Sequence, residues 1–399
     1  MPLKSKPNKE VKTVKPDNKK DVSKPRSKSS GLVLGGVRDI LPKDQKYWHL
    51  ITDRIEQLAK DYGFAKIDTS ILEKKALFEK GLGKNSRALE QIFSFVDQAG
   101  ENIALRPTAT FSLVRAYNEQ KMNTRPQPVK LYYQGPMLRY LPARANNYRQ
   151  TYQFGFEALG SDQPVVDAQL ILIAFNFYKD LDIPAMVQIN SIGCPACRAE
   201  YRKVLVDHYR QKKNLLCQNC KDSFAKNPLD IFGCQEVKCQ ELKEDVPQII
   251  DHLCESCKNH FIKVLEYLDE LGLPYILNPY LIRESDYGTR TVFELWPEEA
   301  DRVTQPLARG GRYDDLAEAL GGEPAPACGF AVEIEQVISK IREKEIPIAE
   351  KETYEVFLAQ LCEQDRRKAL VLFVDLREKG IKVAEGFSQT GLKAQRERA

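Results

Sequence analysis

The chain has 399 residues, of which 42% are hydrophobic and 29% charged, a composition typical of a globular protein with a substantial core. No stretch of about 18 apolar residues is present and the N-terminus lacks the apolar segment of a secretory signal, so we expect a cytoplasmic protein that does not cross a membrane. Residues 1–30 hold ten Lys or Arg against three acidic residues, which gives this segment a net charge of +7. The whole chain has a net charge of +4, so the remaining residues carry −3.

The segment 1–30 is rich in Lys, Pro and Ser and almost free of apolar residues, which predicts a disordered basic tail. Two interpretations of it stay open: weak, salt-dependent attraction to nucleic acid, and a solubilising extension. Apolar residues at helical spacing then predict a helix from Trp48 to Tyr62, ended by Gly63. Residues 64–73 are strand-like, and residues 80–120 indicate a pair of strands that runs into a helix.

An antiparallel hairpin is predicted from two alternating segments, 129–140 and 148–160, around the connection 141–147. The period of two places Gln153, Gly155 and Glu157 on one face of its second strand. The opposite face carries Tyr152, Phe154 and Phe156 and can pack on the core. The hairpin therefore offers a polar face backed by an apolar one.

A long helix over 165–181 and a strand over 185–193 follow the hairpin, and strands return after residue 270. Residues 190–262 interrupt this pattern with cysteine pairs and charged helical stretches, which indicates an insertion within a core that spans residues 31–345. Residues 326–343 are expected to be a strand that leads into a helix. Residues 353–399 give strand, helix, strand and the start of another helix, which is part of an α/β domain.

Eight of the ten cysteines lie within the insertion, which favours a metal site over a disulfide scaffold. They form four pairs with gaps of two or four residues, the spacing that presents two thiolates to one tetrahedral ion. Two structural zinc sites of four thiolates each fit this number, and both sequential and nested pairing are possible. We expect Cys328 and Cys362, outside the insertion, to be buried small hydrophobic residues. The predicted ligands are Cys194, Cys197, Cys217, Cys220, Cys234, Cys239, Cys254 and Cys257.

Four segments occur in a fixed order: GPMLRY (135–140), YRQTYQFGFE (148–157), LIRESDYGTRTVFELW (281–296) and GGRYDDL (310–316). In this order they resemble the motifs of the histidyl-tRNA synthetases, which belong to the class II aminoacyl-tRNA synthetases. The resemblance covers residues 35–399 and implies an α+β fold: an antiparallel sheet flanked by helices, a zinc-type helical insertion, and an anticodon-binding domain that lacks about its second half.

The resemblance also implies roles for individual residues. Arg139 would hold the α-phosphate of ATP and the carboxylate of the amino acid, and Arg283 would add a second positive charge there, so these two are the catalytic candidates. Glu157 would accept a hydrogen bond from the imidazole of histidine. The implied binding residues for histidine and ATP are Thr108, Ala109, Thr110, Arg139, Gln153, Glu157, Arg283, Tyr287 and Gly288.

Several positions depart from the family's pattern. Thr108 stands where the family has the glutamate that receives the substrate ammonium, and Gly288 replaces a tyrosine of the histidine pocket. In the third motif, GFAVEIEQ (329–336), Glu333 replaces a glycine and Gln336 replaces the arginine that holds the γ-phosphate of ATP. An added carboxylate near a polyphosphate repels it, so these changes bear directly on the use of ATP.

The resemblance therefore implies a histidine–tRNA ligase that consumes ATP with Mg²⁺, binds L-histidine and tRNA(His), and forms a homodimer. Two alternatives remain open, because the departures weaken the ATP contacts: a histidine-binding regulatory subunit, and a zinc-containing RNA-binding protein with an inactive site. Histidine-dependent exchange between ATP and diphosphate separates the enzyme from both alternatives.

Overall fold

The computed structural model describes residues 33–83, 86–141, 148–224, 227–234, 236–243, 245–282, 287–298, 305–348, 354–360, 362–387 and 391–398. The predicted basic tail and the candidate Arg283 lie outside these residues. Within them, no helix combines the length and the apolar character needed to cross a lipid bilayer.

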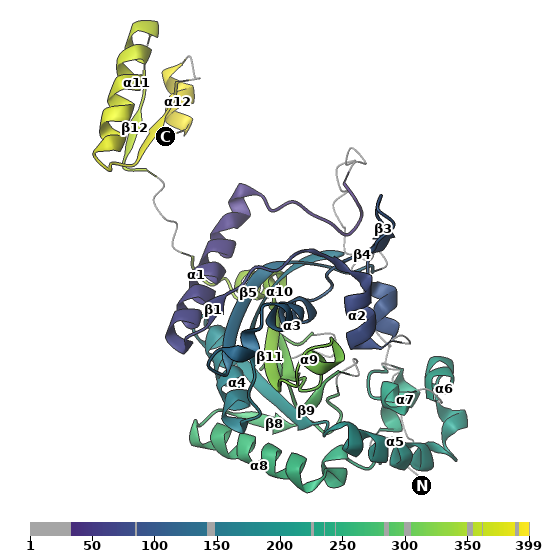
Figure 1. The fold of residues 1–399 in the computed structure, drawn as a ribbon. Helices are drawn as coiled ribbons and strands as arrows, with labels where there is room; N and C mark the ends of the chain where they lie inside the picture. The colour runs from purple at the N-terminus through teal and green to yellow at the C-terminus, as the bar shows by residue number, and fades with distance from the viewer. Residues whose placement is uncertain are drawn as a thin grey trace, which may run out of the picture.

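An eight-stranded sheet forms the centre of the molecule, with the strand order β1-β5-β6-β11-β10-β9-β7-β8 (Figure 1). Its inner strands pair antiparallel, whereas β1 and β8 are added in parallel at the two edges. The strands are β1 (Ala65–Lys66), β5 (Val129–Leu138), β6 (Gln150–Leu159), β7 (Ala185–Ser191), β8 (Tyr275–Leu277), β9 (Thr289–Pro297), β10 (Ala308–Arg312) and β11 (Ala327–Glu333).

Helices cover both faces of this sheet. One face buries Phe154, Phe156 and Phe330 under the first set of helices. The other face packs Tyr133, Met137 and neighbouring residues against a second set. The first set is α1 (Gln45–Tyr62), α4 (Pro164–Lys179), α8 (Glu255–Glu270) and α10 (Ile334–Glu343), and the second is α2 (Lys75–Leu82), α3 (Thr110–Glu119) and α9 (Leu316–Ala319).

The remaining elements are short. A three-stranded sheet, ordered β2-β4-β3, lies beside α2 and consists of β2 (Leu72–Lys74), β3 (Ser94–Val96) and β4 (Asn102–Leu105). The C-terminal part pairs β12 (Val356–Leu358) in parallel with β13 (Val383–Glu385), accompanied by α11 (Glu363–Glu378) and α12 (Leu392–Arg398). The 3₁₀ helices are η1 (Pro42–Asp44), η2 (Arg87–Gln91), η3 (Met122–Thr124), η4 (Lys213–Leu215), η5 (Pro228–Ile231) and η6 (Ile249–His252).

The insertion leaves the sheet at the end of β7 and returns through α8. It contains α5 (Pro195–Tyr209), α6 (Gln218–Phe224) and α7 (Val237–Glu241) around a core of its own, which includes Tyr201, Leu205 and Tyr209. The predicted boundary at residue 262 falls inside α8, which packs against α4 and β9 of the central domain. Figure 1 shows α5, α6 and α7 grouped beyond the end of α8.

Most sequence-based elements agree with the structure. The helix expected from Trp48 to Tyr62 is α1, with Gly63 in the left-handed conformation at its C-cap. The predicted hairpin is β5 and β6, and its expected polar face is not open to solvent, because Gln153 and Glu157 are buried. The expectation for Cys362 is wrong: this residue is exposed at the start of α11, with Sγ 3.1 Å from Asp365 Oδ2.

Candidate active site and cysteine clusters

A cavity of about 740 Å³ opens where the β5–β6 hairpin meets the start of α1 and one side of α10. Its polar walls carry both signs of charge, contributed by arginine and lysine side chains and by four carboxylates. The charged lining residues are Arg38, Asp39, Asp44, Arg139, Arg149, Arg309, Glu333, Glu335, Lys340 and Arg342. Such a mixture suits a ligand that carries both positive and negative groups.

Arg139 directly follows β5, and its backbone N–H donates to the Arg149 carbonyl at 2.8 Å. Its side-chain Nε donates to the carbonyl of Pro107 at 3.1 Å, which ties the guanidinium to the segment before α3. This contact holds the planar charge against the wall of the cavity. Thr108 and Ala109 follow Pro107 along the chain, with Ala109 buried at the N-cap of α3.

Glu157 lies on β6 with a side chain that is only 2% exposed. Its carboxylate accepts hydrogen bonds from Thr110 Oγ1 at 2.9 Å and from the Tyr313 hydroxyl at 2.5 Å. Opposite it on β11 stands Gly329, where a Cβ atom would lie 1.5 Å from Glu157 Oε2. Glycine at this position is thus required for the carboxylate to lie where it does.

The ring of Tyr287 borders the same region. It packs edge-on against Phe111 of α3, with ring centroids 5.0 Å apart, and against Tyr313 at 6.4 Å. The structure therefore brings Glu157, Thr110 and Tyr287 together, as the sequence predicts, and adds Tyr313. Tyr313 and Gly329 are not among the residues predicted from the sequence, although both lie in the glycine-containing motifs 310–316 and 329–336.

Gln153, on the same strand as Glu157, contacts a residue that lines the cavity. It is 4% exposed, pairs with Glu333 across β6 and β11, and lies with its amide Nε2 3.3 Å from Glu333 Oε1. Glu333 Oε2 in turn accepts from Gln336 Nε2 at 3.1 Å. The two residues that depart from the family's third motif are thus in contact with each other, and Glu333 also contacts Gln153, a predicted histidine-binding residue.

Glu335 lies deeper in the same wall. Both of its carboxylate oxygens lie within hydrogen-bonding distance of the backbone N–H of Tyr152, at 3.0 and 3.1 Å. Burial raises the pKa of Glu335 to about 7, against the opposing effect of this N–H and of Arg38. The side chain therefore takes up a proton close to neutral pH.

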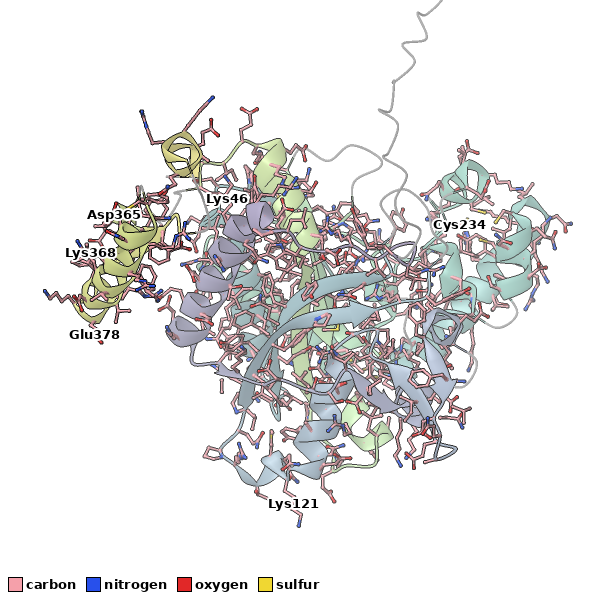
Figure 2. All side chains as sticks on the ribbon, turned by 90° about the horizontal axis from the view of Figure 1, so that it is seen from above. Lys46, Lys121, Cys234, Asp365, Lys368 and Glu378 are labelled. Carbon is pink, nitrogen blue, oxygen red and sulfur yellow. The ribbon has the colours of Figure 1, made fainter. Side chains whose placement is uncertain are left out.

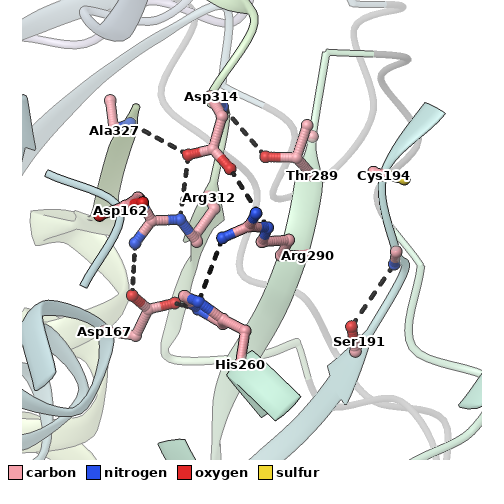
Figure 3. A network of polar contacts seen from close by, with 12 residues as sticks. Asp162, Asp167, Ser191, Cys194, His260, Thr289, Arg290, Arg312, Asp314 and Ala327 are labelled. Carbon is pink, nitrogen blue, oxygen red and sulfur yellow. Dashed lines mark hydrogen bonds and ion pairs between the residues drawn. The ribbon is translucent and has the colours of Figure 1, made fainter. Parts of the chain in front are cut away.

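A buried network of ionisable groups ties the sheet to α4 and α8 (Figure 3). Arg312 is fully buried and contacts Asp167 at 2.5 Å and Asp314 at 3.0 Å. His260 lies between Asp167 and Arg290, 3.3 Å from each. Although burial acts in the opposite direction, Arg312 and His260 hold the pKa of Asp167 below its ordinary value. This network is not predicted from the sequence, because its members come from four separate segments.

The eight cysteines of the insertion form two clusters with nested pairing. The outer cluster joins Cys194 and Cys197 to Cys254 and Cys257, and the inner cluster joins Cys217 and Cys220 to Cys234 and Cys239. All four sulfur atoms of a cluster lie within 4.8 Å of one another. Of the two arrangements that the sequence left open, the structure has the nested one. Figure 2 labels Cys234 among the helices of the insertion.

The sulfur geometry fits a tetrahedral metal ion. Zinc–sulfur bonds of about 2.3 Å in a tetrahedron place the sulfurs about 3.8 Å apart, and Cys217 Sγ and Cys234 Sγ are 3.7 Å apart. The backbone N–H of Cys220 lowers the pKa of Cys217 to about 7. At Cys194 burial acts to raise the pKa, but the N–H of Cys197 and further hydrogen bonds lower it to about 7. Both thiols therefore ionise more easily than an ordinary cysteine, as metal ligands must.

Residues next to the outer cluster contact the segment that carries Tyr287 and Gly288. Arg198, next to Cys197 on α5, donates a hydrogen bond to the Gly288 carbonyl. The backbone N–H of Arg290 donates to the carbonyl of Gly193 at 2.8 Å, directly before Cys194. The neck of the insertion is therefore fixed to the predicted histidine signature.

Comparison with known proteins identifies the family. The histidyl-tRNA synthetase family profile matches residues 36–193 and 236–337. Histidine–tRNA ligases of Pelotomaculum thermopropionicum and Desulforamulus reducens are 39% and 37% identical, each over 90% of this chain and 85% and 86% of their own length. The apo histidyl-tRNA synthetase of Staphylococcus aureus superimposes with a TM-score of 0.77 at 34% identity, covering 92% of this chain and 88% of that one.

A second solved structure is similar in fold alone. A Bacillus halodurans protein described as an ATP phosphoribosyltransferase regulatory subunit/histidyl-tRNA synthetase has a TM-score of 0.66 at 22% identity, covering 93% of this chain and 97% of that one. The antiparallel-dominated sheet flanked by helices is the fold expected of class II aminoacyl-tRNA synthetases. Within that class, the chain belongs to the histidyl-tRNA synthetase family.

Proposed function

We propose that this protein is a histidine–tRNA ligase, which joins histidine to ATP as histidyl-adenylate and then transfers the histidyl group to tRNA(His). The observation that carries the proposal is the arrangement along the hairpin: the Arg139 guanidinium lies in a wide polar cavity, and the buried Glu157 carboxylate lies further along β6. The relatives named histidine–tRNA ligase support it over nearly the whole chain.

In the first reaction the carboxylate oxygen of histidine attacks the α-phosphorus of ATP, and diphosphate leaves. Arg139 binds the α-phosphate with a charge that cannot be lost at neutral pH, and Arg283 adds a second one. When bound together with ATP, Mg²⁺ would supply positive charge for the diphosphate leaving group. Holding both reactants in one cavity supplies much of the acceleration, so no nucleophilic side chain is required.

Selection of histidine rests on the second half of the site. Glu157 accepts the imidazole N–H, while Thr110, Gln153, Tyr287 and Gly288 form the walls around the ring. Thr110 already orients the carboxylate through its hydroxyl. An apolar side chain of similar size would cover this buried carboxylate without adding a donor to those of Thr110 and Tyr313, which is costly, so it is rejected.

The test is histidine-dependent exchange of labelled diphosphate into ATP by purified protein. We expect exchange with histidine, and a loss of at least about 100-fold in Arg139→Gln, as is typical when an electrostatic contact to a transition state is removed. No exchange at millimolar histidine would contradict the enzyme.

A histidine-binding regulatory protein is the second candidate, favoured by one observation. Gln336 occupies the place of a phosphate-binding arginine and contacts the carboxylate of Glu333, which lines the cavity. Titration calorimetry with histidine alone, combined with absent exchange, would support this candidate. An absence of heat as well would leave an RNA-binding role.

The two cysteine clusters are proposed to hold one structural zinc ion each, because four thiolates leave no ligand position for water. When bound, zinc would cross-link parts of the insertion that are distant in the sequence, and it would take no part in the reaction. Metal analysis should return about two zinc ions per chain. A metal-free protein with all thiols reactive would contradict this assignment.

We further propose a cytoplasmic homodimer, with residues 353–399 contributing to anticodon binding and residues 190–262 forming the insertion. The second copy is expected at the small β2-β4-β3 sheet, where Leu72, Phe95 and Val96 are exposed to 54%, 49% and 62%. Sedimentation of the full chain tests the dimer, and Phe95→Asp should shift it towards the monomer.

A further inference from the structure

The third-motif carboxylate, Glu333, lies between the two halves of the proposed active site. On one side it lines the cavity that contains Arg139. On the other its Oε1 lies 3.3 Å from Nε2 of Gln153, which is four residues before Glu157 on β6. A bound amino acid that places its carboxylate at Arg139 and its ring at Glu157 therefore brings its α-ammonium group to this middle position.

Glu333 differs from the other acidic residues of the cavity in its partners. Asp44 forms an ion pair with Arg342 at 2.6 Å, and Glu335 accepts the Tyr152 N–H and lies 3.9 Å from Arg38. Asp39 is exposed at the edge. Among the contacts described for Glu333, the hydrogen-bonding partners are the neutral amides of Gln153 and Gln336. Unlike Asp44 and Glu335, Glu333 therefore has no described contact with a cation.

Because position 108 is a threonine, binding of the substrate ammonium group requires a negative charge from another residue. An ammonium group that leaves water needs an anionic or strongly polar partner, since burial of an unpaired cation is costly. Thr108, beside Pro107 and hence beside the Arg139 side chain, offers only a hydroxyl. The neighbouring Gln153 offers an amide, which cannot neutralise a charge.

We propose that Glu333 is the receptor for the α-ammonium group of the amino-acid substrate, so that the carboxylate missing at position 108 is supplied from the opposite strand. The inference rests on the proposed function, because it assumes that histidine occupies this site. Gln153 and Gln336 act as positioning residues that hold the two carboxylate oxygens of Glu333. Glu333 thus determines whether the site distinguishes an α-amino acid from the corresponding acid without an amino group.

The experiment compares two ligands on the full-length protein by titration calorimetry: L-histidine and 3-(imidazol-4-yl)propionate, which lacks only the ammonium group. For the wild type we expect histidine to bind more tightly. In Glu333→Gln, histidine should bind roughly 10- to 100-fold more weakly, the effect of losing a hydrogen bond between charged groups. The affinity for imidazolylpropionate should stay the same or rise, because a carboxylate no longer repels it.

Two further variants complete the test. Glu323→Gln removes an equal charge from an exposed position outside the cavity and should retain the wild-type ratio of affinities. Thr108→Glu combined with Glu333→Gly returns the carboxylate to the other wall and should restore the preference for histidine that Glu333→Gly alone loses. Recovery in the double variant also shows that the loss does not come from misfolding.

The outcomes separate the inference from the function on which it rests. If Glu333→Gln keeps the wild-type ratio while wild type binds histidine, the ammonium role is overturned and the ligase proposal stands. If wild type binds neither ligand, both are overturned. A ratio that falls only in the Glu333 variants supports the inference, whether or not ATP is used.

Discussion

Glu157 is a carboxylate that two hydroxyl groups already orient, and its value to the site depends on its charge and its position. Glu157→Gln keeps the size of the side chain but replaces one acceptor oxygen with a donor, which opposes the hydroxyls of Thr110 and Tyr313. We expect kcat/KM for histidine in the exchange reaction to fall by roughly 100-fold or more, since a charged hydrogen bond and its orientation are both lost.

Tyr313→Phe is the matched control for this change. It removes one donor to Glu157 but leaves the carboxylate and Thr110 in place, so the expected loss is about tenfold or less. Equal losses in the two variants would show that packing around Tyr313, and not the charge of Glu157, controls the use of histidine.

Glu335 gives the protein a predictable dependence of stability on pH. Its folded-state pKa is raised to about 7 from an ordinary value of 4.5, so between these two values the folded state binds more protons than the unfolded state. Its contribution to stability is therefore present at low pH and is lost as pH rises through about 7, with an upper limit of about 3 kcal/mol.

Glu335→Gln removes this titration while keeping an acceptor for the Tyr152 N–H. Urea unfolding of both proteins at pH 5 and pH 8 measures the effect. Between pH 5 and pH 8, the free energy of unfolding of the wild type should fall relative to that of the variant. A difference between the two proteins that does not change with pH would contradict the raised pKa.

At the residue scale, the sequence predicted which side chains belong to the candidate site better than it predicted their neighbours. Gln153 and Glu157 were identified because a strand period and a family motif both point to them, and Arg139 was identified from the family motif. Tyr313 and Gly329 were missed, because their importance comes from contacts across strands that are distant in the sequence. Only the register between β6 and β11 reveals that Gly329 makes room for Glu157.

At the scale of elements, the insertion is held by two clusters whose consequences differ. The outer cluster lies next to Arg198, which contacts Gly288, whereas the inner one joins parts of the insertion to each other. Changing Cys254 and Cys257 to Ser should remove about one zinc per chain and weaken histidine binding by several-fold, because the neck no longer positions the Gly288 segment.

The matched variant changes Cys234 and Cys239 to Ser and should also remove about one zinc. Its effect on histidine binding should be smaller, since its cluster has no described contact with the Tyr287–Gly288 segment. Zinc content by atomic emission and histidine affinity by calorimetry are measured on the same samples. A larger loss of affinity in the inner-cluster variant would refute the proposed connection.

Element types could be predicted from periodicity, but the pairing of the cysteines could not. Four pairs with similar spacing are compatible with more than one pairing, and spacing within a pair carries no information about its partner pair. The nested arrangement follows from the return of the chain: α8 begins beside the point where α5 leaves β7, so the first and last pairs meet. The packing of α8 against α4, which requires tertiary contacts, was equally inaccessible.

At the scale of the whole molecule, the buried network around Arg312 joins structures on which both halves of the site depend. Asp167 belongs to α4, His260 to α8 at the exit of the insertion, and Arg290 and Arg312 to neighbouring strands (Figure 3). Because Arg312 has no exposure, removing its charge leaves Asp167 without its strongest partner. We expect Arg312→Met to lower the free energy of unfolding by about 3–5 kcal/mol.

A double-mutant cycle distinguishes this electrostatic role from simple packing. Asp167→Leu should also destabilise, by leaving Arg312 buried with Asp314 alone. The combination of Arg312→Met with Asp167→Leu should cost less than the sum of the two single changes, because neither then leaves the other's charge unpaired. Urea unfolding followed by tryptophan fluorescence gives all three values. Strict additivity would mean that the two side chains contribute independently, and that the network does not couple α4 to the strands that carry the site.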